Sequence, residues 1–178
     1  RGQLARQSFT SKEEALAALG GSSPSRSPDR PTTVQPSRVD PLDSQVVPYD
    51  RNLYGGWIDA HGDCQDTRQE VLIAESLVTV ELDSRGCRVQ SGEWFDPFTG
   101  QTFTNPSHLD IDHFVPLAEV HRSGGSNWTP ERRHNYSNDL SYPGTLIAVS
   151  ASANRSKQDR DPADWLPPNE DFHYDYAT

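Results

Sequence analysis

Short hydrophobic stretches separated by polar turns run through the part of the chain that follows residue 48. Val78 and Val80 alternate with their neighbours, which is the period of a half-buried strand. Leu146-Ile-Ala-Val149 is a continuous apolar run of strand length. Patterns of these kinds predict four short strands, at residues 77–82, 87–95, 109–114 and 146–149.

Helix-start signals lie between these strands. Thr67-Arg-Gln-Glu70 is a capping box, and Ser150 is a hydroxyl cap ahead of Ala151. Such signals predict helices over 67–76, from Thr129-Pro130, over 150–158 and over 161–166, with one more over 11–19. Because short strands and helices are interspersed, the pattern is typical of an α+β domain.

The region 21–48 differs from the rest of the chain. It holds six Pro and six Ser with little hydrophobic periodicity, which is typical of a linker or a disordered segment. We therefore predict an N-terminal extension over 1–45, largely disordered or similar to a pro-segment, and a folded domain over 46–178.

The charge of the chain argues against a broad basic surface for binding nucleic acid. The formal net charge is −10, and 14 of the 16 cations are Arg. Arg is the side chain that binds phosphate in bidentate fashion, so a small local phosphate site is compatible with this composition. No apolar run is long enough to span a membrane. The chain begins at Arg1 and lacks Met, which we interpret as a mature or trimmed product.

Two cysteines, Cys64 and Cys87, are present without CxxC spacing, which excludes a thiolate zinc finger. They are either two free buried thiols or one disulfide. A disulfide here closes a 24-residue loop and adds roughly 3 kcal/mol in the chain-entropy model. The low apolar content, 33%, favours the disulfide and a secreted protein.

The densest cluster of chemically active residues is His108-Leu-Asp-Ile-Asp-His113. On a strand, His108, Asp110 and Asp112 share one face and His113 lies on the other. Three acceptors on one face indicate a cation site, and the alternative is a solvated edge strand of an acidic protein.

Asp112-His113-Phe-Val-Pro-Leu117 resembles the first strand of the HNH endonucleases, whose fold is the ββα-metal (His-Me) finger. Residues 146–149 and the helix carrying Asn154-Arg-Ser-Lys157 resemble the second strand and the helix of that motif. Shorter matches to the secreted branch of the family extend the resemblance over 49–168. It implies an α+β fold with a ββα-metal HNH core, additional helices, a small β-hairpin and one disulfide. Unlike many HNH proteins, the chain has no CxxC pairs around the motif.

The resemblance implies a role for each motif residue. Asp112 and Asn154 would bind one divalent cation, which suits hard cations that keep several waters. His113 would act as general base, because a neutral imidazole accepts a water proton near neutral pH. Asn138 is counted with the catalytic residues because it would brace the loop that positions the histidine. The expected phosphate-binding side chains are Arg68, Arg155 and Lys157.

We therefore predict a secreted endonuclease that hydrolyses phosphodiester bonds of DNA, with RNA as a further candidate substrate. Mg²⁺ is the expected cation, with Mn²⁺ and Ca²⁺ as alternatives, and no membrane partner is expected. Little sequence preference is expected, because no helix-turn-helix or finger is evident. Two alternatives are a zinc hydrolase built on the H-x-D-x-D-H cluster of 108–113 and an inactive binding domain stapled by its disulfide.

Overall fold

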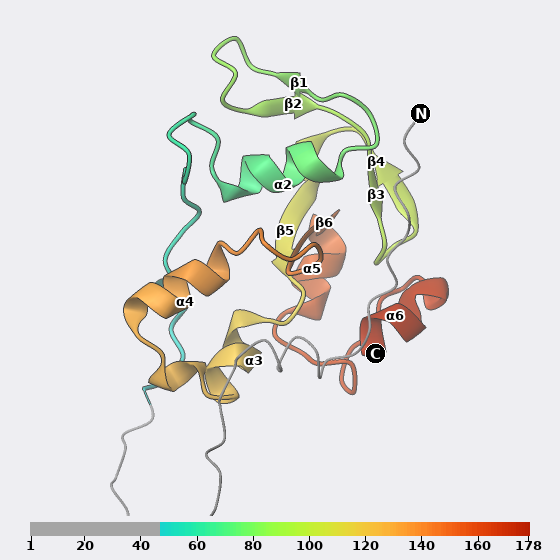
Figure 1. Ribbon diagram of the computed structural model, residues 1–178. Helices are drawn as coiled ribbons and strands as arrows, with labels where there is room; N and C mark the ends of the chain where they lie inside the picture. Colours follow the sequence, from blue (N-terminus) through green and yellow to red (C-terminus); the bar gives the residue numbers. More distant parts are fainter. Residues whose placement is uncertain (1–46) are drawn as a thin grey trace, which may run out of the picture. The chain divides into compact units, whose positions relative to one another are not determined.

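The computed structural model describes residues 47–178, of which 47–177 form one compact unit (Figure 1). The α-helices are α2 (Thr67–Glu75), α3 (Leu117–Arg122), α4 (Pro130–Ser137), α5 (Ala151–Lys157) and α6 (His173–Ala177). The strands are β1 (Glu81–Leu82), β2 (Val89–Ser91), β3 (Trp94–Asp96), β4 (Gln101–Phe103), β5 (Leu109–His113) and β6 (Leu146–Ser150). Short 3-10 helices are η1 (Arg51–Tyr54), η2 (Pro106–His108), η3 (Gly125–Asn127) and η4 (Glu170–Phe172). The predicted helix over 11–19 and the extension 1–45 lie outside the described residues.

The centre of the unit is the antiparallel pair β5–β6, followed directly by α5. Ile111 pairs with Ala148 and His113 with Leu146. The Ser150 side chain accepts from the Ala153 backbone N–H and begins α5, as its hydroxyl predicted. Along the chain α3 and α4 lie between the two strands, so the pair and α5 form a β-β-α arrangement with a helical insertion.

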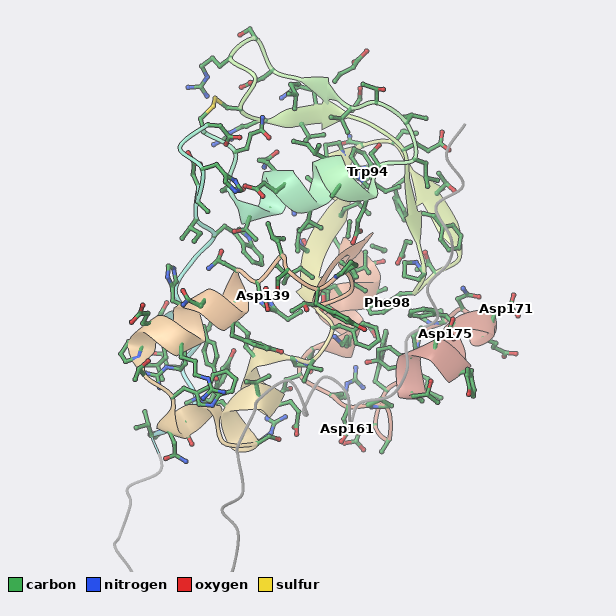
Figure 2. All side chains as sticks on the ribbon, viewed as in Figure 1. Trp94, Phe98, Asp139, Asp161, Asp171 and Asp175 are labelled. Atoms are coloured by element: carbon green, nitrogen blue, oxygen red, sulfur yellow. A yellow bond between two sulfur atoms is a disulfide. The ribbon has the colours of Figure 1, made fainter. Side chains whose placement is uncertain are left out.

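The β5–β6 pair separates two hydrophobic clusters. Val71 and Leu72 of α2 pack against one face together with Trp94, whose indole nitrogen donates to the Leu72 carbonyl at 2.8 Å. Phe98 lies in the cluster on the other face, with Tyr176 of α6 (Figure 2). The β5–β6 pair is therefore covered on both faces, and its side chains alternate between two packed surfaces.

The strand predicted over 87–95 is two strands of different sheets. β2 pairs with β1, and β3 pairs with β4. The break falls at Gly92, where an added Cβ would lie 2.6 Å from the Trp94 ring. The next backbone group, the Glu93 carbonyl, accepts from Leu77 N–H instead of a strand partner. The strand predicted over 77–82 is also shorter than expected: only Glu81–Leu82 form a strand, which pairs with β2.

Two other local predictions also need correction. Residues 161–166 form a single turn closed on the Asp161 carbonyl rather than a helix. Pro167 and Pro168 follow, and a residue before proline disfavours helical backbone, which explains the early stop. The N-cap of α2 is Asp66, which accepts from Gln69 N–H, and not the predicted Thr67.

Cys64 and Cys87 form a disulfide with a Cα–Cα distance of 5.1 Å, which confirms the predicted pairing. Cys64 has φ of +68°, in a loop shaped by the Asp59 carboxylate. That carboxylate accepts backbone N–H groups from Gly62, Asp63 and Cys64. The bridge joins the loop before α2 to the loop before β2.

The carboxylate of Glu75, on α2, contacts the backbone of β6. It accepts a hydrogen bond from the Ala148 N–H at 2.8 Å. Burial raises the pKa of Glu75 to about 7, although this hydrogen bond acts in the opposite direction. In the unfolded chain the group titrates near pH 4.3. The folded state therefore holds a proton on Glu75 at pH values where the unfolded state has lost it.

We expect this carboxyl to destabilise the fold as the pH rises from about 4.5 to about 7, because the unfolded state binds fewer protons there. Glu75→Gln keeps a side-chain oxygen for Ala148 and removes the charge. The free energy of unfolding of this variant should exceed that of wild type by at most about 3 kcal/mol at pH 8 and match it near pH 4. Urea denaturation at both pH values measures the difference, and an equal difference at the two values contradicts the prediction.

Candidate active site

A pocket of about 330 Å³ lies at the C-terminal end of β5. Its walls come from the segment before η1, from β5, from the start of α3 and from α5, and they include Tyr49, Arg51, Asp112, His113, Asn154 and Asp159. The structure thus brings the two predicted metal ligands and the predicted base together in one pocket. Strand β5 carries Asp112 and His113, and α5, which follows β6 directly, carries Asn154.

His113 is 5% exposed, and its ring stacks on Trp57 at 5.4 Å between centroids. Its Nε2 lies 3.0 Å from the Ser137 carbonyl oxygen. A carbonyl only accepts, so Nε2 carries the hydrogen and Nδ1 keeps its lone pair. Burial, with smaller contributions from the charges of Arg51 and Lys157, lowers the pKa of His113 to about 4. The imidazole is therefore neutral and able to accept a proton at neutral pH.

Asp112 is 7% exposed and forms an ion pair with Lys157, Nζ to Oδ2 2.5 Å. Burial raises the pKa of Asp112 to about 6, and the ammonium of Lys157 opposes that rise. Burial likewise lowers the pKa of Lys157, and Asp112 opposes that fall. The pairing leaves Oδ1 as the carboxylate oxygen open to another ligand.

The structure corrects the expectation that Lys157 binds a flanking phosphate, because Lys157 has no exposed surface. Besides Asp112, its ammonium donates to the His113 and Phe114 carbonyls, each at 3.1 Å. It also lies 5.7 Å from the centroid of the Phe98 ring. Lys157 therefore joins α5 to the end of β5 and neutralises Asp112, so it acts on the site from within the core.

Asn154 lies on α5, and its Nδ2 is 3.4 Å from Asp110 Oδ2. Arg155 Nε lies at the same distance from that oxygen, and the Arg155 side chain is 75% exposed. With its amide nitrogen turned to Asp110, Asn154 presents its amide oxygen as the free end. Arg155 is at the surface, as a phosphate-binding residue must be, but it already has a carboxylate partner.

Asn138 follows α4 and does not line the pocket. Its Oδ1 accepts the Ile58 backbone N–H at 3.2 Å, and its Nδ2 donates to the Gly56 carbonyl at 3.1 Å. These bonds hold the segment that carries Trp57, on which His113 stacks. The structure places Asn138 as a brace for this segment, without direct contact to His113.

Arg68 of α2 is remote from the pocket. Its Nη2 donates to the Pro106 and Leu109 carbonyls at 2.9 and 3.0 Å, at the start of β5. The guanidinium therefore holds η2 and β5 against α2. It lines a different, polar hollow between α2, β2 and η2.

The cluster 108–113 does not form one face of ligands. His108 lies in η2 rather than on β5, while Asp110 and Asp112 face α5 through Asn154 and Lys157. Within residues 47–178 no three His, Cys, Asp or Glu side chains are grouped as a metal site requires. The two predicted ligands at the pocket, Asp112 and Asn154, therefore amount to one carboxylate and one amide.

Sequence reasoning missed three residues at the site. Tyr49 and Arg51 line the pocket, and Trp57 supports the His113 ring. All three precede α2, in a segment without a recognisable motif. The only local signal there is the run Tyr49-Asp-Arg51, near the start of the folded domain, which combines an aromatic and two charged side chains.

Comparison with known proteins supports a nuclease family. Residues 67–178 match the family model of the C-terminal domain of GmrSD restriction endonucleases. An uncharacterized secreted protein of Arthroderma benhamiae is 40% identical over 129 residues, which cover 72% of this chain. The chain spans 61% of the length of that relative. No solved structure matches.

In residues 47–178 no helix is long and apolar enough to cross a membrane.

The family match covers α2 to α6, and so it includes β5, β6 and α5 with every predicted motif residue. The chain belongs to the family of GmrSD restriction endonuclease C-terminal domains, a family of nuclease type.

Proposed function

We propose that the protein is a metal-dependent endonuclease that hydrolyses phosphodiester bonds of DNA. One observation carries the proposal: Asp112, His113 and Asn154 line one pocket, with the proton-accepting nitrogen of His113 free. These are the residues of the HNH pattern. Membership of a nuclease family supports the same activity independently of the geometry.

In this proposal His113 takes the proton of the attacking water. Its Nε2–H is held by the Ser137 carbonyl, so proton transfer goes to Nδ1 and the ring does not need to turn. Stacking on Trp57 fixes the plane of the ring. The lowered pKa keeps His113 unprotonated before the reaction, so it is ready to accept at neutral pH.

Asp112 and Asn154 fit a hard divalent cation. Both present oxygen, one a carboxylate Oδ1 beside the Lys157 pair and one an amide oxygen turned away from Asp110. Hard cations such as Mg²⁺ accept few protein oxygens and keep waters in the remaining positions, for which a pocket of about 330 Å³ has room. When bound, such an ion stabilises the negative charge that develops on the phosphate and the leaving oxygen. Mg²⁺ is the proposed cation, with Mn²⁺ or Ca²⁺ as substitutes.

The substrate and location follow from the same features. The negative net charge and the small site favour brief contact with little sequence preference, and RNA is a further substrate to be tested. The Cys64–Cys87 disulfide and the secreted relative support an extracellular enzyme. No specific observation favours a zinc hydrolase or an inactive binding domain over this assignment.

Metal removal tests the proposal. The full chain is incubated with supercoiled plasmid DNA in Mg²⁺, in Mn²⁺ and after treatment with EDTA. We expect nicked and linear plasmid with either ion, no cleavage in EDTA, and recovery when excess Mg²⁺ is added back. An Asp139→Asn variant, which removes one carboxylate beside α4 and away from the pocket, should behave like wild type. Cleavage that persists in EDTA, or none with any divalent ion, contradicts the proposal.

A further inference from the structure

Arg51 differs from the other charged side chains of the pocket wall in the ion pairs that it makes. The two pocket carboxylates each have a cation partner: Asp112 pairs with Lys157, and Asp159 with Arg122 at 2.9 Å. Arg51 also lines the pocket, and its side chain has no hydrogen bond or ion pair among the residues that the structure describes. Within residues 47–178 no carboxylate engages the Arg51 guanidinium, so it can bind an anionic ligand.

Arg51 and His113 line the same pocket. Its charge is near enough to contribute to the lowered pKa of the imidazole. The residue is exposed, so the guanidinium stays hydrated and reachable by a solute. An anion bound by Arg51 would therefore lie beside the proton-accepting ring.

The backbone that carries Arg51 is held firmly. Upstream, the ring of the buried His121 bonds to the Val47 carbonyl at 2.6 Å. Downstream, the Ser137 hydroxyl donates to the Tyr54 carbonyl at 2.6 Å. Both partners come from elements far along the chain, α3 and α4. The η1 segment is therefore a preorganised support, and a ligand that binds Arg51 need not order the loop first.

We propose that Arg51 binds a backbone phosphate of the nucleic acid, the scissile phosphate or the one next to it. The inference rests on the proposed nuclease function. A guanidinium is suited to this task because its parallel N–H groups match two phosphate oxygens. It also explains how a chain with net charge −10 binds a polyanion: the contact is local and needs no basic surface.

The three side chains that the resemblance implied as phosphate-binding, Arg68, Arg155 and Lys157, are less suited to bind a phosphate at the pocket. Lys157 is buried, and Arg68 donates to backbone carbonyls away from the pocket. Arg155 is exposed but paired with Asp110. Arg51 is exposed, lies on the pocket wall and has no side-chain partner within residues 47–178.

The test compares Arg51→Ala with Arg85→Ala, which removes the same charge from the exposed turn between β1 and β2. Steady-state cleavage of a short DNA duplex is measured for both in Mg²⁺. For Arg51→Ala we expect kcat/KM to fall about 10- to 100-fold, mostly through KM, because the contact is made in the bound ground state as well. Arg51→Lys should be intermediate, and Arg85→Ala should match wild type.

A second readout separates a phosphate contact from a general structural effect. Binding of the same duplex is measured at several salt concentrations, with each variant placed on a His113→Ala background that blocks cleavage. Loss of one phosphate contact should reduce the slope of log K against log salt by about 0.9. Melting temperatures should not change for Arg51→Ala, because the side chain is exposed and has no partner to lose among residues 47–178.

The outcomes separate the two proposals. If wild type cleaves DNA and Arg51→Ala matches Arg85→Ala in both KM and salt slope, the assignment of Arg51 is refuted while the nuclease function stands. If wild type neither cleaves nor binds DNA in Mg²⁺, the nuclease function fails and the role of Arg51 falls with it.

Discussion

Replacing His113 with alanine should lower the rate of DNA cleavage by roughly 10²–10⁴-fold, the range typical of losing a general base. The reason is geometric: Nδ1 of His113 is the free proton acceptor in the pocket that also holds Asp112 and Asn154. Mn²⁺ binding, followed by electron paramagnetic resonance, should be largely kept, because the proposed ligands remain. Steady-state cleavage of plasmid DNA measures the rate.

Two controls separate loss of the base from loss of the fold. His108→Ala removes an exposed imidazole just before the same strand, and it should cleave at the wild-type rate. His113→Gln fills more of the space beside Trp57 than alanine but provides no base, so it should be as inactive as His113→Ala. Urea denaturation checks that both His113 variants are folded. A folded His113→Ala variant that cleaves like wild type removes His113 from the mechanism.

Replacing Lys157 with methionine should reduce the free energy of unfolding by roughly 3–5 kcal/mol, as for other buried ion pairs that lose one partner. The substitution keeps most of the length of the side chain but leaves the Asp112 carboxylate buried without a counter-charge. It also removes the donor to the His113 and Phe114 carbonyls. Urea unfolding at pH 7 measures the change.

The neighbouring pair on the same helix is the matched control. Arg155→Met breaks an exposed contact with Asp110, which should cost less than about 1 kcal/mol. Adding Asp112→Asn to Lys157→Met should recover part of the lost stability, because a neutral amide needs no counter-charge. If Lys157→Met loses no more stability than Arg155→Met, the buried ion pair is not the anchor of β5 to α5.

The elements that sequence reasoning located best are those with local signals. Ser150 caps α5, and the apolar run before it becomes β6, so β6 and α5 could be predicted from adjacent residues. Asp112 and His113 were predicted on opposite faces of a strand. The structure agrees, because Asp112 pairs with α5 while His113 stacks on Trp57.

What sequence reasoning missed depends on contacts between distant residues. The burial of Lys157 follows from how α5 docks on β5, and a motif of the form Asn-Arg-Ser-Lys does not show it. Arg51 lines the pocket in a segment whose Val47 carbonyl is hydrogen-bonded to His121, 74 residues later. The split of 87–95 into two strands follows from the fit of Gly92 against Trp94. The local pattern of hydrophobic and polar residues predicts none of these three features.

The most direct test of the central claim is where a metal ion binds. Crystals of the full chain soaked in Mn²⁺ are measured near the manganese absorption edge, so that the anomalous difference map shows the ion. The account predicts one peak in contact with both Asp112 and Asn154, in the pocket beside His113. A peak on His108 or Asp110, with none at Asp112 and Asn154, would contradict it.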